Sequence, residues 1–304
     1  MIQFTSLEAR IDAAAHIVLA RLPRGRFADG LVEFVVFGLK QAWACLFGGL
    51  MLAMILLTTF WWPDNGIDRY DVFFVAALLI QAGMLAFRLE TLGEAKVILI
   101  FHVVGTGMEL FKTAAGSWTY PEDAFFRLGG VPLFSGFMYA CVGSYMARIL
   151  RIFDITFTRY PPVWMTVLVA VAIYGNFFSH HFIFDFRWVL FAVVVALYLR
   201  STMHYRVFRF RHRMPMLLAF LLVALFIWIA ENVGTFTSAW IYPDQKDGWS
   251  LVPIAKLGSW YLLMMLSFVL VTVVHRPERA APLRAQAASG SRSPGTAGEA
   301  SRPS

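Results

Sequence analysis

Long apolar runs alternate with short polar segments along most of the chain, and several runs exceed the roughly 20 residues that a helix needs to span a bilayer. This pattern predicts an all-α fold, a polytopic bundle of membrane-spanning helices. We expect about eight spans, at about 40–61, 71–88, 95–113, 131–150, 162–179, 185–200, 214–233 and 253–275. Prolines near four of these starts fit the first turn of a helix, where a missing N–H costs least.

The two ends of the chain differ from this apolar middle. Residues 5–22 open with a Thr-x-x-Glu capping pattern and then place apolar positions on one helical face between arginines. They predict an amphipathic helix on the membrane surface within an N-terminal segment at 1–30, with a short soluble cap as the alternative. A membrane domain at 31–276 follows. The tail at 277–304 is rich in Ala, Ser, Gly, Pro and Arg, so we expect it to be disordered.

The composition supports a membrane protein, and its charges predict an orientation. Only 15% of the 304 residues are charged and 59% are hydrophobic, whereas soluble domains carry about 25% charged residues. The net charge of +7 does not indicate nucleic acid, because lysines and arginines gather in short loops on the side that also holds both termini. We therefore expect both termini to be cytoplasmic. The outward-facing loops would lie near 62–70, 114–130, 180–184 and 234–252, and the basic run 200–214 would contact anionic lipid or only fix the orientation.

One phrase occurs twice with the same internal spacing. MELFKTAAGSWTYPED at 108–123 and AENVGTFTSAWIYPDQ at 230–245 each contain a Glu, eight residues, a Trp, one residue, and Tyr-Pro followed by an acid. The phrases lie 122 residues and four predicted spans apart, so both would face the same side of the membrane. This predicts an internal repeat of two weakly similar parallel halves, about 31–150 and 151–276, related by an axis along the membrane normal.

The glutamates of the two phrases are the first candidates for chemistry. Glu109 lies about 20 Å along its helix from Lys96, and Glu231 about 24 Å from Pro215, at a rise of about 1.5 Å per residue. Both positions are near the outer boundary of the hydrocarbon, where a carboxylate costs on the order of 1–3 kcal/mol unless it is paired or faces a wet cavity. The two groups would therefore face each other across the bundle, or each would only anchor its own loop.

Three histidines add polar chemistry to the same outer half of the chain. His102, Thr106 and Glu109 share one helical face because of their i, i+4, i+7 spacing. His180 and His181 lie in an outer loop and are weak candidates for a metal, but no known metal motif is present and adjacent histidines point apart on a helix. We expect no metal and no cofactor. No phosphate-binding, dinucleotide or nucleophile motif occurs.

Five segments resemble the bacterial membrane-protein family filed as domain of unknown function 817. They are FGLKQAWACLFGGLML (37–52), LETLGEAKVILIFHVVGTGMELFKTAAGSWTYPE (89–122), GVPLFSGFMYACVGSY (130–145), NFFSHH (176–181) and AENVGTFTSAWIYPDQ (230–245). The likeness covers most of residues 31–275. It implies a multi-pass protein of the bacterial cytoplasmic (inner) membrane and says nothing about chemistry.

A second likeness is local and covers some 30–40 residues per half. Glu109, Gly116, Trp118, Tyr120 and the Gly-Val-Pro-Leu at 130–133 are similar to a pattern in membrane carotenoid hydratases, and membrane lycopene cyclases carry a related Trp-x-Tyr and acid arrangement. The chain differs from the hydratase pattern in adding Pro-Glu after Tyr120. This resemblance implies acid/base chemistry on an isoprenoid or carotenoid-like lipid.

The first functional hypothesis is therefore an enzyme that hydrates or cyclises a double bond of such a lipid. A poorly hydrated carboxyl group favours its protonated form and can deliver a proton, and ring faces can stabilise the resulting cation. We predict Glu109 and Glu231 as the acid/base pair, with His102 orienting one of them. The predicted substrate-binding residues are Trp118, Tyr120, Trp240, Tyr242, Glu122, Asp244, Thr106 and Asn232.

Two other classes of protein remain open. Paired acids near a pseudo-axis also suit a proton-coupled transporter or a channel for a small solute. In a non-catalytic structural protein, the Trp and Tyr residues would belong to the interfacial belt and each Glu would hold its turn. The expected partners are membrane lipid and a hydrophobic small molecule, without nucleic acid.

Overall fold

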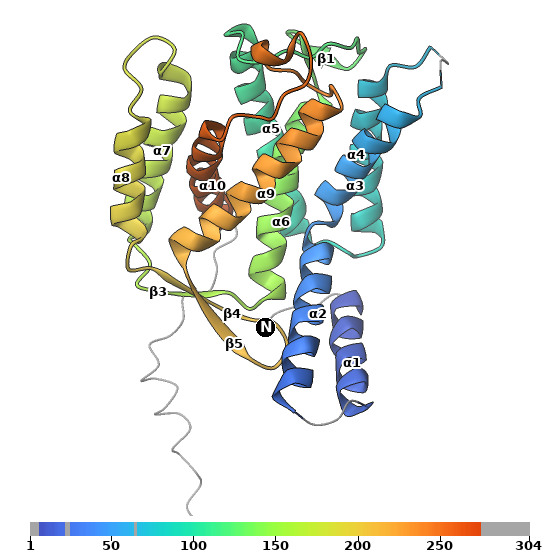
Figure 1. Ribbon diagram of the computed structural model, residues 1–304, viewed down its shortest axis with the longest axis vertical. Coiled ribbons are helices and arrows are strands. Elements are labelled where there is room, and N and C mark those ends of the chain that lie inside the picture. The colour runs from blue at the N-terminus through green and yellow to red at the C-terminus, as the bar shows by residue number, and fades with distance from the viewer. Residues whose placement is uncertain (1–5, 22–24, 64–65, 275–304) are drawn as a thin grey trace, which may run out of the picture.

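Ten α-helices make up most of the computed structural model, which describes residues 6–21, 25–63 and 66–274 (Figure 1). The helices are α1 (Ser6–Arg21), α2 (Arg26–Ala44), α3 (Leu46–Phe60), α4 (Arg69–Ala86), α5 (Leu92–Ala114), α6 (Phe134–Ile152), α7 (Val163–Ser179), α8 (Arg187–Tyr198), α9 (Met216–Phe236) and α10 (Ala255–Val274). The predicted all-α bundle is thus confirmed. The predicted tail lies outside the described residues.

Every predicted span overlaps one helix from α3 to α10, but only some of these helices suit a membrane crossing. Across the three described ranges, α4, α5, α9 and α10 are long and apolar enough to span, and α2 with α3 would add a fifth span if this pair, bent by 70°, is counted as one. Helix α8 has 12 residues, and about 18 Å of helix is shorter than a hydrocarbon core of about 30 Å. These apolar helices indicate a membrane protein. That the chain crosses the membrane eight times stays a prediction.

The helix preceding the first predicted span was not anticipated. A span was expected from residue 40, but α2 runs from Arg26 to Ala44, and α3 leaves it at a bend. Polar contacts hold α2 at one end of the bundle, because the buried Lys40 ammonium pairs with Asp12 at 3.0 Å and donates to the Val207 carbonyl at 2.6 Å. Glu33 of α2 accepts hydrogen bonds from the backbone N–H groups of Arg209 and Phe210, which follow Val207 in the chain.

A small antiparallel sheet closes the end of the bundle next to α2 (Figure 1). It contains β3 (Thr156–Thr158), β4 (Thr202–Arg206) and β5 (Arg211–Pro215), in the order β3-β4-β5. The basic run 200–214, expected to contact anionic lipid or only to fix the orientation, forms a hairpin in which His204 faces Arg213 in register. Apart from this sheet, β1 (Arg127–Leu128) and β2 (Val131–Pro132) form a short hairpin in the loop between α5 and α6.

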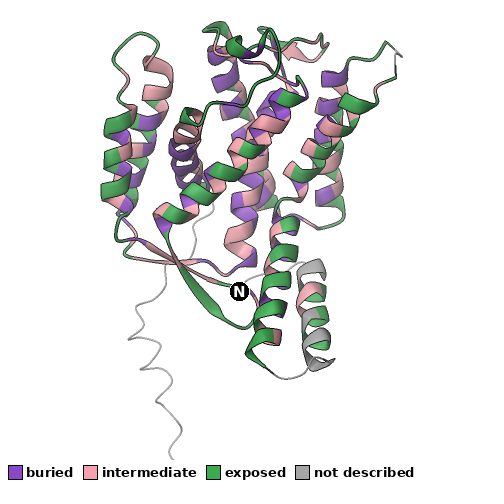
Figure 2. Cartoon of the chain, viewed as in Figure 1, coloured by how far each residue is buried: buried purple, intermediate pink, exposed green. Residues whose placement is uncertain are grey.

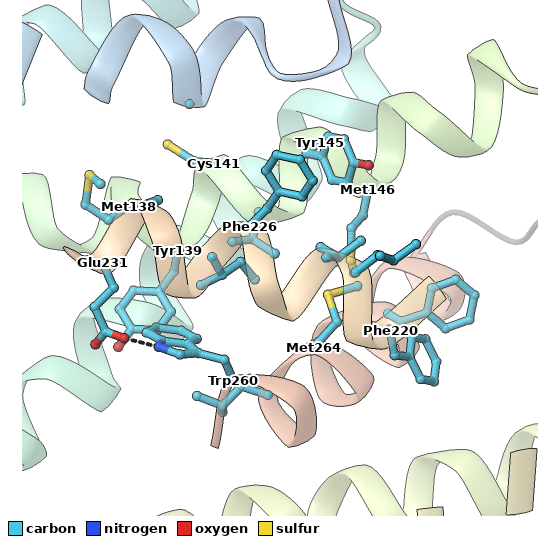
Figure 3. Close-up of a pocket in the computed structure, with 18 of the residues that line it drawn as sticks. Met138, Tyr139, Cys141, Tyr145, Met146, Phe220, Phe226, Glu231, Trp260 and Met264 are labelled. Atoms are coloured by element: carbon cyan, nitrogen blue, oxygen red, sulfur yellow. Dashed lines mark hydrogen bonds between the residues drawn. The ribbon is translucent and has the colours of Figure 1, made fainter. Parts of the chain in front are cut away.

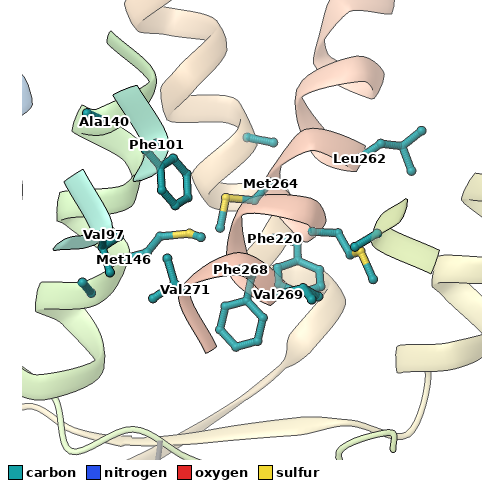
Figure 4. Close-up of a cluster of buried hydrophobic side chains, with 14 of the residues drawn as sticks. Val97, Phe101, Ala140, Met146, Phe220, Leu262, Met264, Phe268, Val269 and Val271 are labelled. Carbon is teal, nitrogen blue, oxygen red and sulfur yellow. The ribbon is translucent and has the colours of Figure 1, made fainter. Parts of the chain in front are cut away.

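The apolar core lies between α5, α6, α9 and α10. Phe101, Met146, Phe220, Met264 and Phe268 meet there, as Figure 4 shows. Outward faces of the helices carry exposed residues instead (Figure 2), and many of these are large and apolar, which fits contact with lipid. The four loops that were predicted to face outward lie together at the end opposite the sheet (Figure 1). The site described next is built at this end.

Candidate functional site

The two repeated phrases end their helices in the same way. Helix α5 ends at Ala114 and α9 at Phe236, which are equivalent positions of the phrases. Two residues later the backbone is left-handed, with φ +71° at Gly116 and +56° at Ser238. Backbone N–H groups one residue further on return to the helices, from Ser117 to Lys112 at 2.9 Å and from Ala239 to Gly234 at 3.0 Å. Both ends are therefore Schellman motifs, which turn each loop back over its own helix.

The two loops meet each other through their backbones. Thr119 and Ile241 form an antiparallel bridge, in which each N–H donates to the carbonyl of the other at 3.0 Å. These two residues occupy the same position in the two phrases, between the Trp and the Tyr. A contact between equivalent positions is what a local pseudo-two-fold axis produces. Extension of this symmetry to complete halves stays a prediction.

Glu109 sits in a cage of aromatic hydrogen-bond donors. Its side chain is 4% exposed, and Oε2 accepts from Nε1 of Trp118 at 2.7 Å and from the hydroxyl of Tyr120 at 2.6 Å. The hydroxyl of Tyr139, on α6, donates to Oε1 at 2.8 Å. Burial and then the charge of Glu109 raise the pKa of the Tyr120 phenol, so this phenol remains a donor.

Glu231 has a similar environment with one difference. It is also 4% exposed, and it accepts hydrogen bonds from the hydroxyl of Tyr242 and from Nε1 of Trp260, on α10. Trp240 makes no such bond, because its ring lies against the backbone of Gly234. Burial, followed by the charges of Glu231 and Glu109, raises the pKa of the Tyr242 phenol. The Tyr242 ring also packs edge-on against Trp118, the donor to Glu109, with 6.0 Å between ring centroids.

Both carboxylates line one cavity of about 900 Å³. The cavity extends from the two loops, with Trp118 and Trp240, along α6, α9 and α10 to methionines of β4 and β5. Figure 3 shows Glu231 at one end of this cavity, hydrogen-bonded to Trp260, with apolar side chains such as Phe220 farther along it. Its size is that of a ligand pocket, for which about 300–1,000 Å³ is usual. The arrangement can hold an apolar molecule against two carboxyl groups.

Cationic side chains lie beside the carboxylates at the same end of the cavity. Lys112, Lys256 and Arg187 all line it. The Lys256 ammonium lies 4.2 Å from the ring centroid of Tyr242, and the Lys112 ammonium lies 4.1 Å from that of Phe177. In the described part of the chain, no carboxylate forms an ion pair with either lysine.

The predicted partners of Glu109 on its own helix do not reach the cavity. The ring of His102 packs against Phe137 at 4.2 Å between centroids, and the structure does not bring it to either carboxylate. Thr106 donates to the backbone carbonyl of His102 at 2.7 Å. Both residues face α6, because Gly136 lets this helix approach them closely. The structure therefore gives His102 no contact through which to orient an acid.

Two of the predicted substrate-binding residues, Glu122 and Asn232, instead brace the loops, and a third lies on the surface. Glu122 pairs with the buried Arg69 of α4, which also donates to the carbonyl of Thr237 at 3.2 Å and so ties the two loops together. Asn232 accepts from the N–H of Val252 at 2.9 Å. Asp244 is exposed. None of the three is part of the cavity lining.

The two adjacent histidines do not point apart as expected. Helix α7 ends at Ser179, so His180 and His181 lie in a turn and their ring centroids are 4.2 Å apart. The Lys112 ammonium approaches Nε2 of both rings, at 3.4 and 2.9 Å. Burial, and then the charge of Lys112, lowers the pKa of His181. No group of three or more metal-ligating side chains occurs among the residues that the structure describes.

Several residues of the site were missed at the level of sequence. Tyr139 and Trp260 complete the two carboxylate cages, but nothing marks them among the chain's 29 Phe, 10 Tyr and 10 Trp residues. Lys112 and Lys256 did carry a signal, because each is a cation within a predicted apolar span. Ionisable residues at such places usually face a cavity or a partner.

Comparison with known proteins identifies relatives without assigning chemistry. The model of a family described as protein of unknown function (DUF817) matches residues 33–268. The chain is also similar to uncharacterized protein YoaT of Bacillus subtilis (strain 168), with 42% identity over 254 residues that cover 84% of this chain and 96% of the relative. No solved structure matches it.

Proposed function

The chain belongs to the DUF817 family of proteins of unknown function, and from the geometry of its site we propose that it is an integral membrane enzyme of the bacterial cytoplasmic membrane. The proposed reaction is acid/base hydration or cyclisation of a double bond in an isoprenoid or carotenoid-like lipid. Glu109 and Glu231 are the proposed catalytic residues. Both termini would be cytoplasmic, which places the site at the outer face.

The observation that carries this proposal is the position of the two carboxylates. They lie on the wall of one largely apolar cavity, and aromatic side chains, rather than loop backbone, donate to both. Asp71, a carboxylate that braces a loop, instead accepts from the backbone N–H groups of Phe125 and Phe126 at 2.8 and 2.9 Å. A buried carboxyl group on an apolar wall suits general acid/base catalysis on an apolar substrate.

Hydration of an alkene in this cavity balances with water as the co-reactant. A carboxylic acid transfers its proton to one carbon of the double bond, which leaves a carbocation on the other carbon. Water then forms a C–O bond to this carbon and gives a proton to the second carboxylate. In a cyclisation, an internal double bond attacks the cation to form a C–C bond, and a carbon next to the new cationic centre then loses a proton to the second carboxylate. The faces of Trp118, Tyr242 and Trp260 would stabilise the cation in either case.

The hydrogen bonds suggest how the two carboxyl groups divide this work. Glu109 accepts three hydrogen bonds from side chains, and such a set favours a carboxylate. Glu231 accepts two, one on each oxygen. We therefore assign Glu109 as the proton acceptor and Glu231 as the proton donor.

Expression in a pigment-producing host tests the proposal. The wild type should yield a lipid or pigment that is heavier than its precursor by one water, or a cyclised isomer of equal mass. Glu109→Gln and Glu231→Gln should each abolish this product, whereas Asp244→Asn, at an exposed acid of the same phrase, should retain it. Lipid profiles identical among the wild type, both variants and a deletion strain would refute the enzyme. Proton-driven solute flux in proteoliposomes would favour a transporter.

A further inference from the structure

We propose that the outer end of the cavity binds the phosphate head group of a single-chain amphiphile, with Lys112, Lys256 and Arg187 as its ligands. The inference rests on the proposed function, because it names the chemical class of the substrate that the cavity would hold. The same chemistry could also come from free phosphate, and the experiment below separates the two sources.

The first observation is that cations from three helices line the same end of the cavity, and that only Arg187 of these three has an ion-pair partner among the described residues. Lys112 comes from α5, Arg187 from α8 and Lys256 from α10, and all three line the cavity. Lys112 lies in the last turn of α5, whereas Arg187 begins α8 and Lys256 lies in the first turn of α10, so all three are at the end of the bundle that holds the two loops (Figure 1). Asp185 pairs with Arg187 at 3.2 Å, so it compensates only part of this positive charge. Like charges held together at a poorly hydrated site are unfavourable unless an anion joins them.

The second observation is that the two lysines are held by contacts that leave their charge in place. Lys112 is 4% exposed, and it donates to Nε2 of His180 and of His181 while lying over the Phe177 ring. Lys256 lies over the Tyr242 ring. Uncharged rings can orient an ammonium group but do not neutralise it. Among the described residues, neither Glu231 nor Asp244 forms an ion pair with Lys256.

The third observation concerns the shape and chemistry of the rest of the cavity. Beyond the cations and carboxylates, the wall is formed by apolar side chains such as Met138, Met146 and Phe226. An amphiphile fits such a cavity, because its hydrocarbon chain would occupy the apolar part and its head group would reach the cations. Two ammonium groups and a guanidinium favour a doubly charged phosphate, since each phosphate oxygen accepts charge-assisted hydrogen bonds.

Binding to the full-length protein in neutral detergent tests this inference without any turnover. The probes are dodecyl phosphate, dodecanol and inorganic phosphate, and the signal is the fluorescence of Trp118, Trp240 and Trp260, which line the cavity. Dodecyl phosphate should bind at least tenfold more tightly than dodecanol, and inorganic phosphate should bind far more weakly than either.

Variants identify the residues that recognise the head group. Lys112→Gln combined with Lys256→Gln should weaken dodecyl phosphate binding at least tenfold and leave dodecanol binding unchanged. Lys256→Arg, which keeps the charge, should retain binding, and so should Lys246→Gln, at an exposed lysine of the same loop region. If the double variant does not fold, Arg187→Gln alone should still weaken the phosphate probe selectively.

The outcomes separate this inference from the proposed function. Equal affinity for dodecyl phosphate and dodecanol, or phosphate affinity that survives all the cation variants, would overturn the inference. Inorganic phosphate that binds as tightly as dodecyl phosphate would also overturn it, in favour of a free-phosphate site. Glu109→Gln removes none of the three cations, so it should not weaken dodecyl phosphate binding, and selective binding without any product in the host would refute only the enzyme. Glutamate-dependent product without head-group selectivity would refute only the inference.

Discussion

Thr119 and Ile241, the residues between Trp and Tyr in the two repeated phrases, exchange a pair of backbone hydrogen bonds of 3.0 Å. This bridge joins the loops that carry the aromatic donors to Glu109 and Glu231. The bridge explains why the two phrases have the same internal spacing. A shift of one residue in either copy would mispair the loops and move a donor away from its carboxylate. The repeat is thus tied to the construction of the cavity wall.

The equivalent turns of the two phrases give a matched test of stability. Gly116 and Ser238 both adopt positive φ, but only Gly116 does so without a steric penalty. A side chain at Gly116 would meet no atom within 4 Å, so Gly116→Ala should destabilise the protein through backbone strain alone, by about 1 kcal/mol. Ser238→Gly should stabilise it by up to a similar amount. Unfolding midpoints of both variants in the same detergent measure these changes, and a loss of stability in Ser238→Gly would contradict the argument.

The donors from α6 and α10 should matter for activity more than for folding. Tyr139→Phe removes one hydrogen bond to Glu109 and keeps the ring, and Trp260→Phe removes one to Glu231 and replaces the indole by a smaller phenyl ring. A hydrogen bond to a charged group contributes about 1.5–3 kcal/mol, so product formation should fall about 10- to 100-fold. The initial rate of product formation in isolated membranes measures the loss. Tyr174→Phe, on α7 and outside the cavity lining, serves as the control and should leave the rate unchanged.

The position of Tyr139 depends on a close approach between α5 and α6. A Cβ at Gly105 would lie 2.7 Å from the Tyr139 side chain, whereas one at Gly107 would meet nothing within 4 Å. Gly107→Ala should therefore stabilise α5 slightly, by up to about 1 kcal/mol. Gly105→Ala should lower the unfolding temperature and the rate of product formation together, because Tyr139 must move. Equal effects of the two substitutions would show that this contact does not position the phenol.

The sequence was informative at the two repeated phrases, because each contains both the end of a helix and the side chains that carry the chemistry. The pairing of Glu109 with Glu231 could be predicted because their depth and spacing match, and the structure brings both to one cavity. Tyr139 and Trp260 could not be predicted, since their role depends on how α6 and α10 pack and not on any local pattern. The role of Glu122 was misjudged for a related reason. Its ion-pair partner, Arg69, lies 53 residues earlier in the chain.

The same limit applies to the larger features of the fold. Apolar periodicity located every helix from α3 to α10, but it did not give the bend that separates α2 from α3 or the length of α8. Charge counting treated the run 200–214 as a connection, although alternating side chains allow it to pair as β4 and β5. The contacts of Lys40 and Glu33 with this hairpin are tertiary, so no window of sequence contains them.

A buried acid between α4 and α5 should make stability depend on pH. Glu90, in the connection between α4 and α5, is 6% exposed. It accepts from Nε2 of Gln81 at 2.6 Å and lies 3.6 Å from the Arg148 guanidinium. Burial raises its pKa from 4.5 to about 6, although Gln81 and Arg148 oppose the shift.

The folded protein therefore holds the proton of Glu90 more firmly than the unfolded chain does. The associated stability is fully present below pH 4.5 and is lost as the pH rises through about 6. A difference of about 1.5 pKa units corresponds to about 2 kcal/mol. Glu90→Gln should abolish this component, so its unfolding temperature should fall less than that of the wild type between pH 4.5 and 7. Asp123→Asn, at a side chain that is 98% exposed, controls for the loss of a carboxylate. A variant whose pH profile parallels the wild type would assign the dependence to another group.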